Sequence, residues 1–182
     1  MIFFMPFIIL DRDGVINHDS NEYIKSPEEW IPIPGSLEAI AKLNRAHFQI
    51  LIATNQSGIA RGHYDLPMLE KIHEKLSQEL ALLGGSVKEI FFCPHHPKEQ
   101  CPCRKPKPGL LYQMQAKYPI HFPETFFIGD SMVDVEAALS VGCIPLLVLT
   151  GRGQSSKEKF KSVPAFSDLN HAADYVIEIS HA

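Results

Sequence analysis

Three aspartates stand where the sequence changes abruptly from apolar to polar residues. Asp11 and Asp13 follow the apolar run FIIL, and Asp130 follows a second run, TFFIG. Carboxylates that lie close together repel one another unless a cation neutralises them, and Mg²⁺ prefers such hard oxygen ligands. A carboxylate held in line with a phosphorus atom can also attack it, so that an aspartyl phosphate divides one difficult step into two. The three aspartates therefore predict magnesium-dependent phosphoryl transfer.

Other residue types in the sequence could supply the remaining parts of that reaction. Asp13 can protonate the leaving oxygen and later take a proton from water. Thr54 offers a hydroxyl and backbone donors, and Lys105 offers a positive charge, to the oxygens of the transferring group. Each feature alone has an ordinary explanation, since an isolated Asp-x-Asp is usually a solvated turn, Thr54 could cap a strand and Lys105 could lie on the surface. Asp134 could simply suit the dipole of a helix start.

A segment rich in cysteine and histidine forms a second candidate site. Cys93, His95, Cys101 and Cys103 lie within eleven residues, and three thiolates with one imidazole are ligands that zinc binds tetrahedrally. A closed set of four leaves no open position, so we predict a structural Zn²⁺ ion that orders a short, proline-rich loop. The alternatives are a reduced thiol cluster or a disulfide such as Cys93 to Cys101. His96 is the weaker candidate of the two adjacent histidines.

The predicted zinc loop would position two cations. Arg104 and Lys105 follow Cys103 directly, so a metal that orders the loop would also orient both side chains towards a bound phosphate. Cys143 lies far from this segment in the sequence and is expected to be a small buried hydrophobic residue.

The elements that must position these residues are predicted from hydrophobic patterning. Short, continuous apolar runs are typical of central strands in a parallel sheet that is covered on both faces. Stretches with helical periodicity separate them, which predicts a doubly wound, mostly parallel α/β sheet. We expect strands over Phe7 to Leu10, Phe48 to Ala53, Val87 to Phe92, Thr125 to Ile128 and Ile144 to Leu149, and helices over Ser36 to Ala46, Leu66 to Leu83, Gly109 to Lys117, Met132 to Val141 and Leu169 to Ile179.

The connections between these elements carry the polar residues. Ligands bind beyond the carboxyl ends of the strands in such sheets, and each candidate residue above follows an apolar run at that end. Gly84 and Gly85 should end the second helix as a C-terminal cap. The stretch of residues 151–164, rich in Ser and Lys, is predicted to be a surface connection.

The composition excludes several classes of partner. A chain of 182 residues with 45% hydrophobic and 21% charged residues fits one soluble globular domain over residues 1–182. The net charge of -4 contains no basic run, which argues against nucleic acid or an anionic membrane as a partner. The first ten residues, MIFFMPFIIL, are too short to span a membrane and lack a signal-peptide cleavage site, so we expect a buried strand with a frayed start. A cytoplasmic monomer that binds a small molecule is the simplest expectation.

Four short motifs resemble, in order, those of the haloacid dehalogenase superfamily. They are DRDG at 11–14, TN at 54–55, KP at 105–106 and GDSMVD at 129–134. The resemblance implies a Rossmann-like core and an Mg²⁺-dependent reaction, with Asp134 in a supporting position. It implies the following roles: Asp11 as nucleophile and magnesium ligand, Asp13 as acid/base with its backbone carbonyl on the metal, Thr54 and Lys105 as residues that hold the phosphoryl group, and Asp130 as a magnesium ligand.

Longer stretches narrow the resemblance to a subgroup that acts on sugar bisphosphates on the route to cell-surface glycans. These are DRDGVIN, TNQSGIARG at 54–62 and CPHHPKEQCPCRKPKPG at 93–109. The subgroup carries a zinc loop and lacks a cap domain, so short loops would provide specificity and Arg104 would bind the distal phosphate. This chain departs from it in a shorter zinc loop and in Ser131, where a Lys is common. The implied substrate contacts are Arg12, Asp19, Ser20, Asn21, Glu22, Asn55, Gln56, Ser57, Arg104 and Ser131.

Two alternatives remain open from the sequence. The histidinol-phosphate phosphatases have a similar domain with a zinc loop. A binding protein that kept the fold without turnover is less favoured, because an idle site has no need of three mutually repelling carboxylates.

Overall fold

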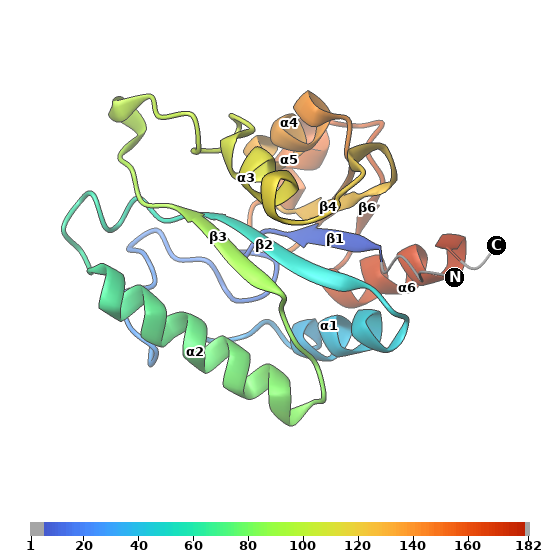
Figure 1. The fold of residues 1–182 in the computed structure, drawn as a ribbon, viewed down its shortest axis with the longest axis horizontal. Coiled ribbons are helices and arrows are strands. Elements are labelled where there is room, and N and C mark those ends of the chain that lie inside the picture. Colours follow the sequence, from blue (N-terminus) through green and yellow to red (C-terminus); the bar gives the residue numbers. More distant parts are fainter. Residues whose placement is uncertain (1–5, 181–182) are drawn as a thin grey trace.

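The computed structural model describes residues 6–180, and its strands form one six-stranded sheet in the order β3-β2-β1-β4-β5-β6 (Figure 1). Every neighbouring pair is parallel. The start of the predicted N-terminal strand, residues 1–5, lies outside the described residues. The strands are β1 (Phe7–Leu10), β2 (Gln49–Asn55), β3 (Glu89–Cys93), β4 (Phe126–Gly129), β5 (Ile144–Val148) and β6 (Ala165–Phe166).

Helices cover both faces of the sheet (Figure 1). One face packs against α1 (Ser36–Arg45), α2 (Leu66–Leu82) and α6 (Leu169–Ser180), and the other against α3 (Gly109–Lys117), α4 (Met132–Val141) and α5 (Gly153–Lys159). Two short 3-10 helices, η1 (Pro97–Glu99) and η2 (Phe122–Glu124), lie in the connections. The prediction of a doubly wound parallel sheet is therefore confirmed.

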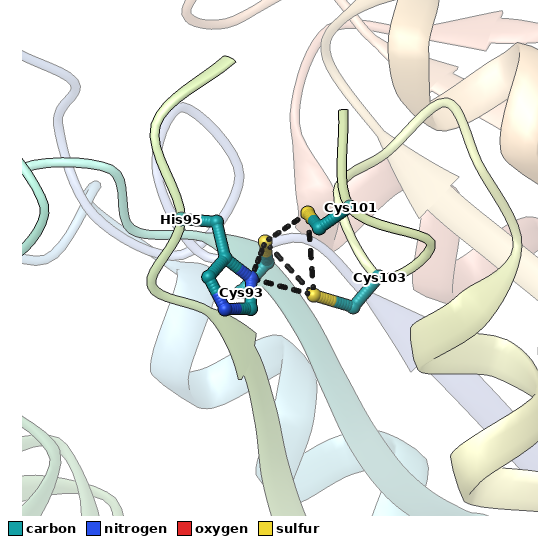
Figure 2. Close-up of side chains that lie close together, drawn as sticks. All are labelled: Cys93, His95, Cys101 and Cys103. Carbon is teal, nitrogen blue, oxygen red and sulfur yellow. Dashed lines mark hydrogen bonds between the residues drawn. The ribbon is translucent and has the colours of Figure 1, made fainter. Parts of the chain in front are cut away.

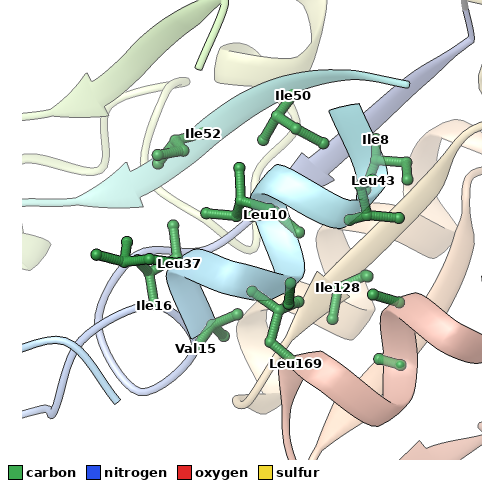
Figure 3. Close-up of a cluster of buried hydrophobic side chains, with 14 of the residues drawn as sticks. Ile8, Leu10, Val15, Ile16, Leu37, Leu43, Ile50, Ile52, Ile128 and Leu169 are labelled. Atoms are coloured by element: carbon green, nitrogen blue, oxygen red, sulfur yellow. The ribbon is translucent and has the colours of Figure 1, made fainter. Parts of the chain in front are cut away.

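The central strand β1 is anchored on both of its faces. Because side chains alternate along a strand, Ile8 and Leu10 point into the core beneath α1 and α6 (Figure 3), whereas Phe7 and Ile9 belong to the core on the opposite face. All four side chains are buried, and each contributes about 1.5–3 kcal/mol relative to full exposure. This packing fixes the carboxyl end of β1, from which the first two aspartates emerge.

The boundaries of most elements agree with the sequence predictions, but β2 is longer. It continues through Thr54 and Asn55, which pair with Phe92 and Cys93 of β3. Those two residues therefore lie on a rigid strand and not in the loop after it. At the end of α2, Gly84 adopts a left-handed conformation with φ 73° and its N–H donates to the carbonyl of Ala81, as expected of a C-terminal cap.

The prediction of a surface connection over residues 151–164 is wrong in part. The segment contains the helix α5, and the two-residue strand β6 follows it. The sequence there has no amphipathic pattern, because only Gly153 and Ser156 of the helix are buried. The helix contacts β5, but it buries only two small residues, so hydrophobic periodicity could not predict it.

The connections above the carboxyl ends of the strands contain little regular secondary structure. Between β1 and α1 there are isolated bridges, which join Asn17 to Asp13 and to Pro32. Neither this connection nor the one between β2 and α2 contains a further helix or strand, so the capless architecture is confirmed. Within residues 6–180 no helix is both long enough and apolar enough to cross a membrane.

Candidate active site and metal centres

A cavity of about 300 Å³ opens at the carboxyl ends of β1, β2 and β4. The strand order changes direction between β1 and β4, which is where ligands bind in open α/β sheets. All five residues predicted to do chemistry line this cavity: Asp11, Asp13, Thr54, Lys105 and Asp130. The predicted substrate contacts that also line it are Asp19, Ser20, Asn21, Asn55, Gln56, Ser57, Arg104 and Ser131.

Two glycines allow the chain to approach Asp130 closely. Gly14 has φ 82° and Gly151 has φ 55°, both in the left-handed region. A Cβ atom at either position would lie 2.1 Å from Oδ2 of Asp130. The glycine of the DRDG motif is therefore required both by its backbone conformation and by the space around the carboxylate.

Lys105 lies at the centre of the site, and its side chain is buried. Its Nζ lies 2.9 Å from Oδ1 of Asp11 and 2.6 Å from Oδ1 of Asp134, and it donates a hydrogen bond of 2.6 Å to the carbonyl of Ala53. Burial works to lower the pKa of Lys105, but the carboxylates of Asp11 and Asp134 raise it overall. The ammonium group is therefore a fixed positive charge beside Asp11.

The carboxylates of Asp11 and Asp130 have the electrostatic properties of a cation site. Burial, and then the charge of Asp134, raise the pKa of Asp11 well above its ordinary value. The same two causes raise the pKa of Asp130 to about 7. One oxygen from each of the three carboxylates lies within 4.8 Å of the others. A hard divalent cation would offset this buried negative charge, so the residues present fit Mg²⁺.

Asp134 differs from the other two carboxylates because both of its oxygens have partners. Oδ1 pairs with Lys105, and Oδ2 accepts from the backbone N–H and the hydroxyl of Ser131 in a capping box at the start of α4. The supporting position that the resemblance implied for Asp134 stays a prediction.

Asp13 is held by hydrogen bonds from three side chains. It accepts from Arg12, Asn17 and Gln56. Burial works to raise its pKa, but the positive charge of Arg12 and these hydrogen bonds lower it overall. Arg12 itself, predicted as a substrate contact, has a fully buried side chain. Two predicted substrate contacts, Arg12 and Glu22, are not among the residues that line the cavity.

The cysteine and histidine residues converge at the end of β3 (Figure 2). The Sγ atom of Cys93 lies 3.1 Å from that of Cys103 and 3.5 Å from that of Cys101. The Nδ1 atom of His95 lies 3.2 Å from Sγ of Cys103 and 3.6 Å from Sγ of Cys93. These four ligand atoms form a group that could hold a metal ion.

The geometry of this group fits zinc. Bonds of about 2.3 Å in a tetrahedron place sulfur atoms about 3.8 Å apart, and the observed separations are slightly shorter. All four cysteines of the chain are free thiols, so the predicted alternative of a disulfide is not present. His96 lies outside the group and caps η1, as its weaker candidacy suggested. Cys143 is buried in the core, as predicted.

The end of the cysteine loop is tied to β2 as well. The backbone N–H of Lys105 donates to Oδ1 of Asn55 at 3.0 Å, and Nδ2 of Asn55 donates to the carbonyl of Lys105 at 3.1 Å. Lys105 is thus fixed by its neighbour on the sheet, whereas Arg104 lies between that clamp and Cys103.

The chain is similar in sequence to known proteins over most of its length. The chain is 54% identical over 155 residues to the D-glycero-beta-D-manno-heptose-1,7-bisphosphate 7-phosphatase of Pseudomonas putida, with 85% of this chain and 89% of the relative covered. It is 55% identical over 146 residues to the protein of the same name from Pseudomonas aeruginosa, with 80% and 82% covered. The HAD-hydrolase-like family model matches residues 102–178.

The structural comparison agrees with the sequence comparison. The crystal structure of D,D-heptose 1,7-bisphosphate phosphatase from B. bronchiseptica, complexed with magnesium and phosphate, matches with a TM-score of 0.93 at 43% identity. The match covers 98% of this chain and 100% of that one. The chain belongs to the heptose bisphosphate 7-phosphatase family of haloacid dehalogenase-like hydrolases.

Some cavity residues of this heptose bisphosphate 7-phosphatase family member were not predicted from its sequence. Tyr23, Arg61 and Arg152 line the cavity. The guanidinium of Arg61 lies 6.0 Å from the ring centroid of Tyr23, and Nε of Arg152 lies 3.4 Å from Oδ2 of Asp19. The only sequence signal for Arg61 is its place in the TNQSGIARG stretch, and Arg152 lies in the connection after β5, which was not expected to reach the site.

Proposed function

We propose that this chain hydrolyses the 7-phosphate of D-glycero-beta-D-manno-heptose 1,7-bisphosphate, in the formation of activated heptose for lipopolysaccharide. The position of Asp11 carries the proposal: its carboxylate lines the cavity 2.9 Å from Nζ of the buried Lys105 and close to Asp130. The heptose substrate is supported by the relatives that bear this name. They disfavour histidinol phosphate, the alternative from the sequence.

The aspartates account for both halves of the reaction. Asp11 attacks the phosphorus atom, so that a new P–O bond forms while the bond from phosphorus to the sugar oxygen breaks. The negative charge of a bound phosphate opposes ionisation of Asp13, so that this carboxyl can carry the proton that it donates to the departing oxygen. Asp13 then takes a proton from a water molecule whose oxygen attacks the aspartyl phosphate, which releases inorganic phosphate and restores the carboxylate of Asp11. The side chain of Asp13 is 20% exposed and lines the cavity, so it can reach both the substrate and water.

Lys105 and Thr54 hold the transferring group. Lys105 is fixed before substrate binds, because Asp134 and the carbonyl of Ala53 already orient its ammonium group. Preorganised donors of this kind stabilise the charge that develops on the phosphoryl oxygens, and removal of one typically costs about 100- to 1,000-fold in rate. Thr54 stands beside them on β2, where Gln56 donates to its hydroxyl oxygen at 2.8 Å.

The carboxylates of Asp11 and Asp130, with the backbone carbonyl of Asp13, would hold the Mg²⁺ ion. When bound, the ion supplies positive charge that offsets the carboxylates and the phosphate. In this proposal Asp134 lies beside the ligands and supports them, because both of its oxygens have partners in Lys105 and Ser131.

Arg104 is placed to recognise the second phosphate of the substrate. It lines the cavity, and its Nη1 is buried without a hydrogen-bond partner among the described residues. A buried donor of this kind needs an acceptor, and a phosphate oxygen supplies one with opposite charge. A structural Zn²⁺ ion on the cysteine cluster would hold Arg104 in this position, since Cys103 precedes it directly.

We also propose that the protein acts as a monomer in the cytoplasm. A doubly phosphorylated sugar carries charges that oppose passage through a bilayer, so enzyme and substrate are expected in the same compartment. Size-exclusion chromatography with light scattering tests the oligomeric state.

A phosphate-release assay tests the proposed reaction. Wild-type protein is compared with Asp11→Asn on the heptose 1,7-bisphosphate, fructose 1,6-bisphosphate and histidinol phosphate, with Mg²⁺ present. We expect the heptose bisphosphate to give the highest kcat/KM and Asp11→Asn to be inactive while its circular dichroism spectrum matches the wild type. Turnover by Asp11→Asn near the wild-type rate would exclude Asp11 as nucleophile, and a preference for histidinol phosphate would exclude the heptose assignment.

A further inference from the structure

The side chain of Arg12 is buried between the active site and helix α2. No part of its side-chain surface is exposed. Its Nε and Nη2 donate to Oδ1 of Asp13 at 3.1 and 2.8 Å, and Nη2 also lies 3.2 Å from Oδ2. The remaining nitrogen, Nη1, lies 3.1 Å from Nε2 of His73 on α2. The guanidinium group therefore joins Asp13 to a residue of α2 that does not line the active-site cavity.

The chemistry of this contact fixes the state of His73. Arginine can only donate hydrogen bonds, so Nε2 of His73 must accept and the ring proton must be on Nδ1. Burial, and then the positive charge of Arg12, lower the pKa of His73 to about 3. The ring is therefore neutral near pH 7 and presents one tautomer to Arg12.

We propose that His73 is a positioning residue for the general acid/base, because its Nε2 fixes the plane of the Arg12 guanidinium that holds Asp13. The inference rests on the proposed role of Asp13. A buried guanidinium has a strong preference for a full set of acceptors. Without an acceptor at position 73, Nη1 of Arg12 would lose its partner, and the guanidinium group would rotate towards another acceptor.

Such a rotation would change the orientation of Asp13. Arg12 contributes three of the contacts to that carboxylate, while Asn17 and Gln56 contribute one each at 2.9 Å. Arg12 contacts both oxygens of Asp13, so its guanidinium fixes the carboxylate plane together with Asn17, which donates to Oδ1, and Gln56, which donates to Oδ2. The contact to His73 therefore affects the proton-transfer step and leaves the groups that bind the substrate in place.

Two substitutions at position 73 separate this role from simple packing. His73→Leu fills a similar volume without an acceptor, whereas His73→Gln restores an oxygen that can accept from Nη1. Leu80→Ala is the matched control: Leu80 is fully buried on the same helix, two turns further along, so its truncation lowers stability without removing a partner of Arg12.

Steady-state kinetics of the full-length, metal-loaded proteins on the heptose bisphosphate measure the effect. We expect His73→Leu to lower kcat by at least about tenfold and to change KM by less than about twofold. The loss of kcat should stay smaller than the roughly 100- to 10,000-fold contribution of a general acid/base itself. His73→Gln should recover most of the wild-type kcat. Leu80→Ala should retain the wild-type kcat when it is assayed below the melting temperature of that variant. The inference is overturned if His73→Leu keeps the wild-type kcat, if Gln fails to rescue, or if Leu80→Ala loses as much.

A measurement that needs no turnover separates this inference from the proposed function. Nitrogen-15 NMR of histidine-labelled wild-type protein reports which ring nitrogen of His73 carries the proton. A proton on Nδ1 supports the contact, and a proton on Nε2 overturns it, whether or not the heptose bisphosphate is hydrolysed. Absence of wild-type turnover on every substrate would instead contradict the proposed function.

Discussion

The Nζ atom of Lys105 lies 2.6 Å from Oδ1 of Asp134, and both side chains are only 1% exposed. The same ammonium group lies 2.9 Å from Asp11. One buried lysine therefore balances two carboxylates, that of Asp134 and that of the proposed nucleophile Asp11. Removal of one partner from such a pair leaves an uncompensated buried charge, which is far more costly than the loss of a surface ion pair.

Substitution of Lys105 should therefore affect stability as well as activity. Lys105→Met leaves the carboxylates of Asp11 and Asp134 without their cation, and we expect the free energy of unfolding of the metal-free protein to fall by about 3–5 kcal/mol. Lys117→Met is the control, because Lys117 pairs with Glu89 at 2.7 Å while 58% exposed, and its loss should cost less than about 1 kcal/mol. Urea unfolding measures both values. Similar losses for the two variants would contradict the central position of Lys105.

Asp130 should make the stability of the metal-free protein depend on pH. Burial and then Asp134 raise its pKa from 3.8 to about 7, so the folded state keeps a proton that the unfolded state has released. Its stabilising contribution is fully present below about pH 4 and is lost as the pH rises through about 7. The difference in unfolding free energy, wild type minus Asp130→Asn, should therefore fall across this range.

Urea unfolding in a chelating buffer at several pH values tests this dependence. The comparison with Asp130→Asn removes contributions from carboxylates that lie far from Asp130 and leaves those of Asp130 and its neighbour Asp11, whose charges interact. Addition of Mg²⁺ at about 100 times its dissociation constant should stabilise the wild type by about 2.7 kcal/mol and the variant by much less. A pH-independent difference, or equal stabilisation by Mg²⁺, would contradict the assignment of Asp130.

Tyr64 should affect both stability and kcat through its hydrogen bond to Gln56. Its hydroxyl donates to Oε1 of Gln56, which orients Nε2 towards Oδ2 of Asp13 at 2.9 Å and Oγ1 of Thr54 at 2.8 Å. Tyr64→Phe leaves a buried acceptor without its donor, so we expect a loss of about 1–3 kcal/mol in stability. The value of kcat should fall as well, because the side-chain amide of Gln56 can then rotate and exchange the positions of its oxygen and nitrogen. Tyr112→Phe, at a residue that is 51% exposed, should change neither thermal unfolding nor kcat. Equal effects in both variants would exclude the Gln56 explanation.

The sequence predicted those parts of the site that depend on local order. The aspartates at 11, 13 and 130 follow apolar runs, and parallel strands bring such positions to one edge of the sheet. The convergence of the four cysteine and histidine side chains was predictable because all four lie within eleven residues, so a single loop can gather them. In both cases the relevant contacts follow from spacing along the chain or from strand direction.

The contacts that link distant elements could not be predicted in this way. The pairing of Lys105 with Asp134 joins the end of one loop to the first turn of α4, and no periodicity encodes it. Arg12 was expected to contact substrate from the family resemblance, but its side chain turns into the protein and meets His73, 61 positions away. Helix α5 was missed because its seven residues bury too little surface to produce an apolar pattern.

The zinc cluster should control Arg104 more strongly than Lys105, because the two residues are held differently. The side chain of Asn55 clamps both backbone polar groups of Lys105 to β2. Arg104 has no such clamp among the hydrogen bonds of the described residues, and it follows Cys103 directly. Cys101→Ser should lower the zinc content by removing one of four ligands. Cys143→Ser is the control, since Cys143 lies in the core outside the cluster and should retain the wild-type zinc content.

Two substrates show which phosphate Arg104 contacts. Arg104→Ala removes a charge-assisted contact of roughly 1.5–3 kcal/mol, which corresponds to about a 10- to 100-fold loss in kcat/KM. We expect this loss with the heptose bisphosphate and a much smaller one with a monophosphate that lacks the distal group. With the bisphosphate, Cys101→Ser should lose at least as much kcat/KM as Arg104→Ala, because the loop without its metal no longer holds Arg104. With the monophosphate, Cys101→Ser should also have a lower kcat/KM, because the change disturbs Lys105 as well. Equal losses for Arg104→Ala on both substrates would place that arginine on the transferring phosphate, and a zinc-free Cys101→Ser protein with full activity would show that the metal does not position it.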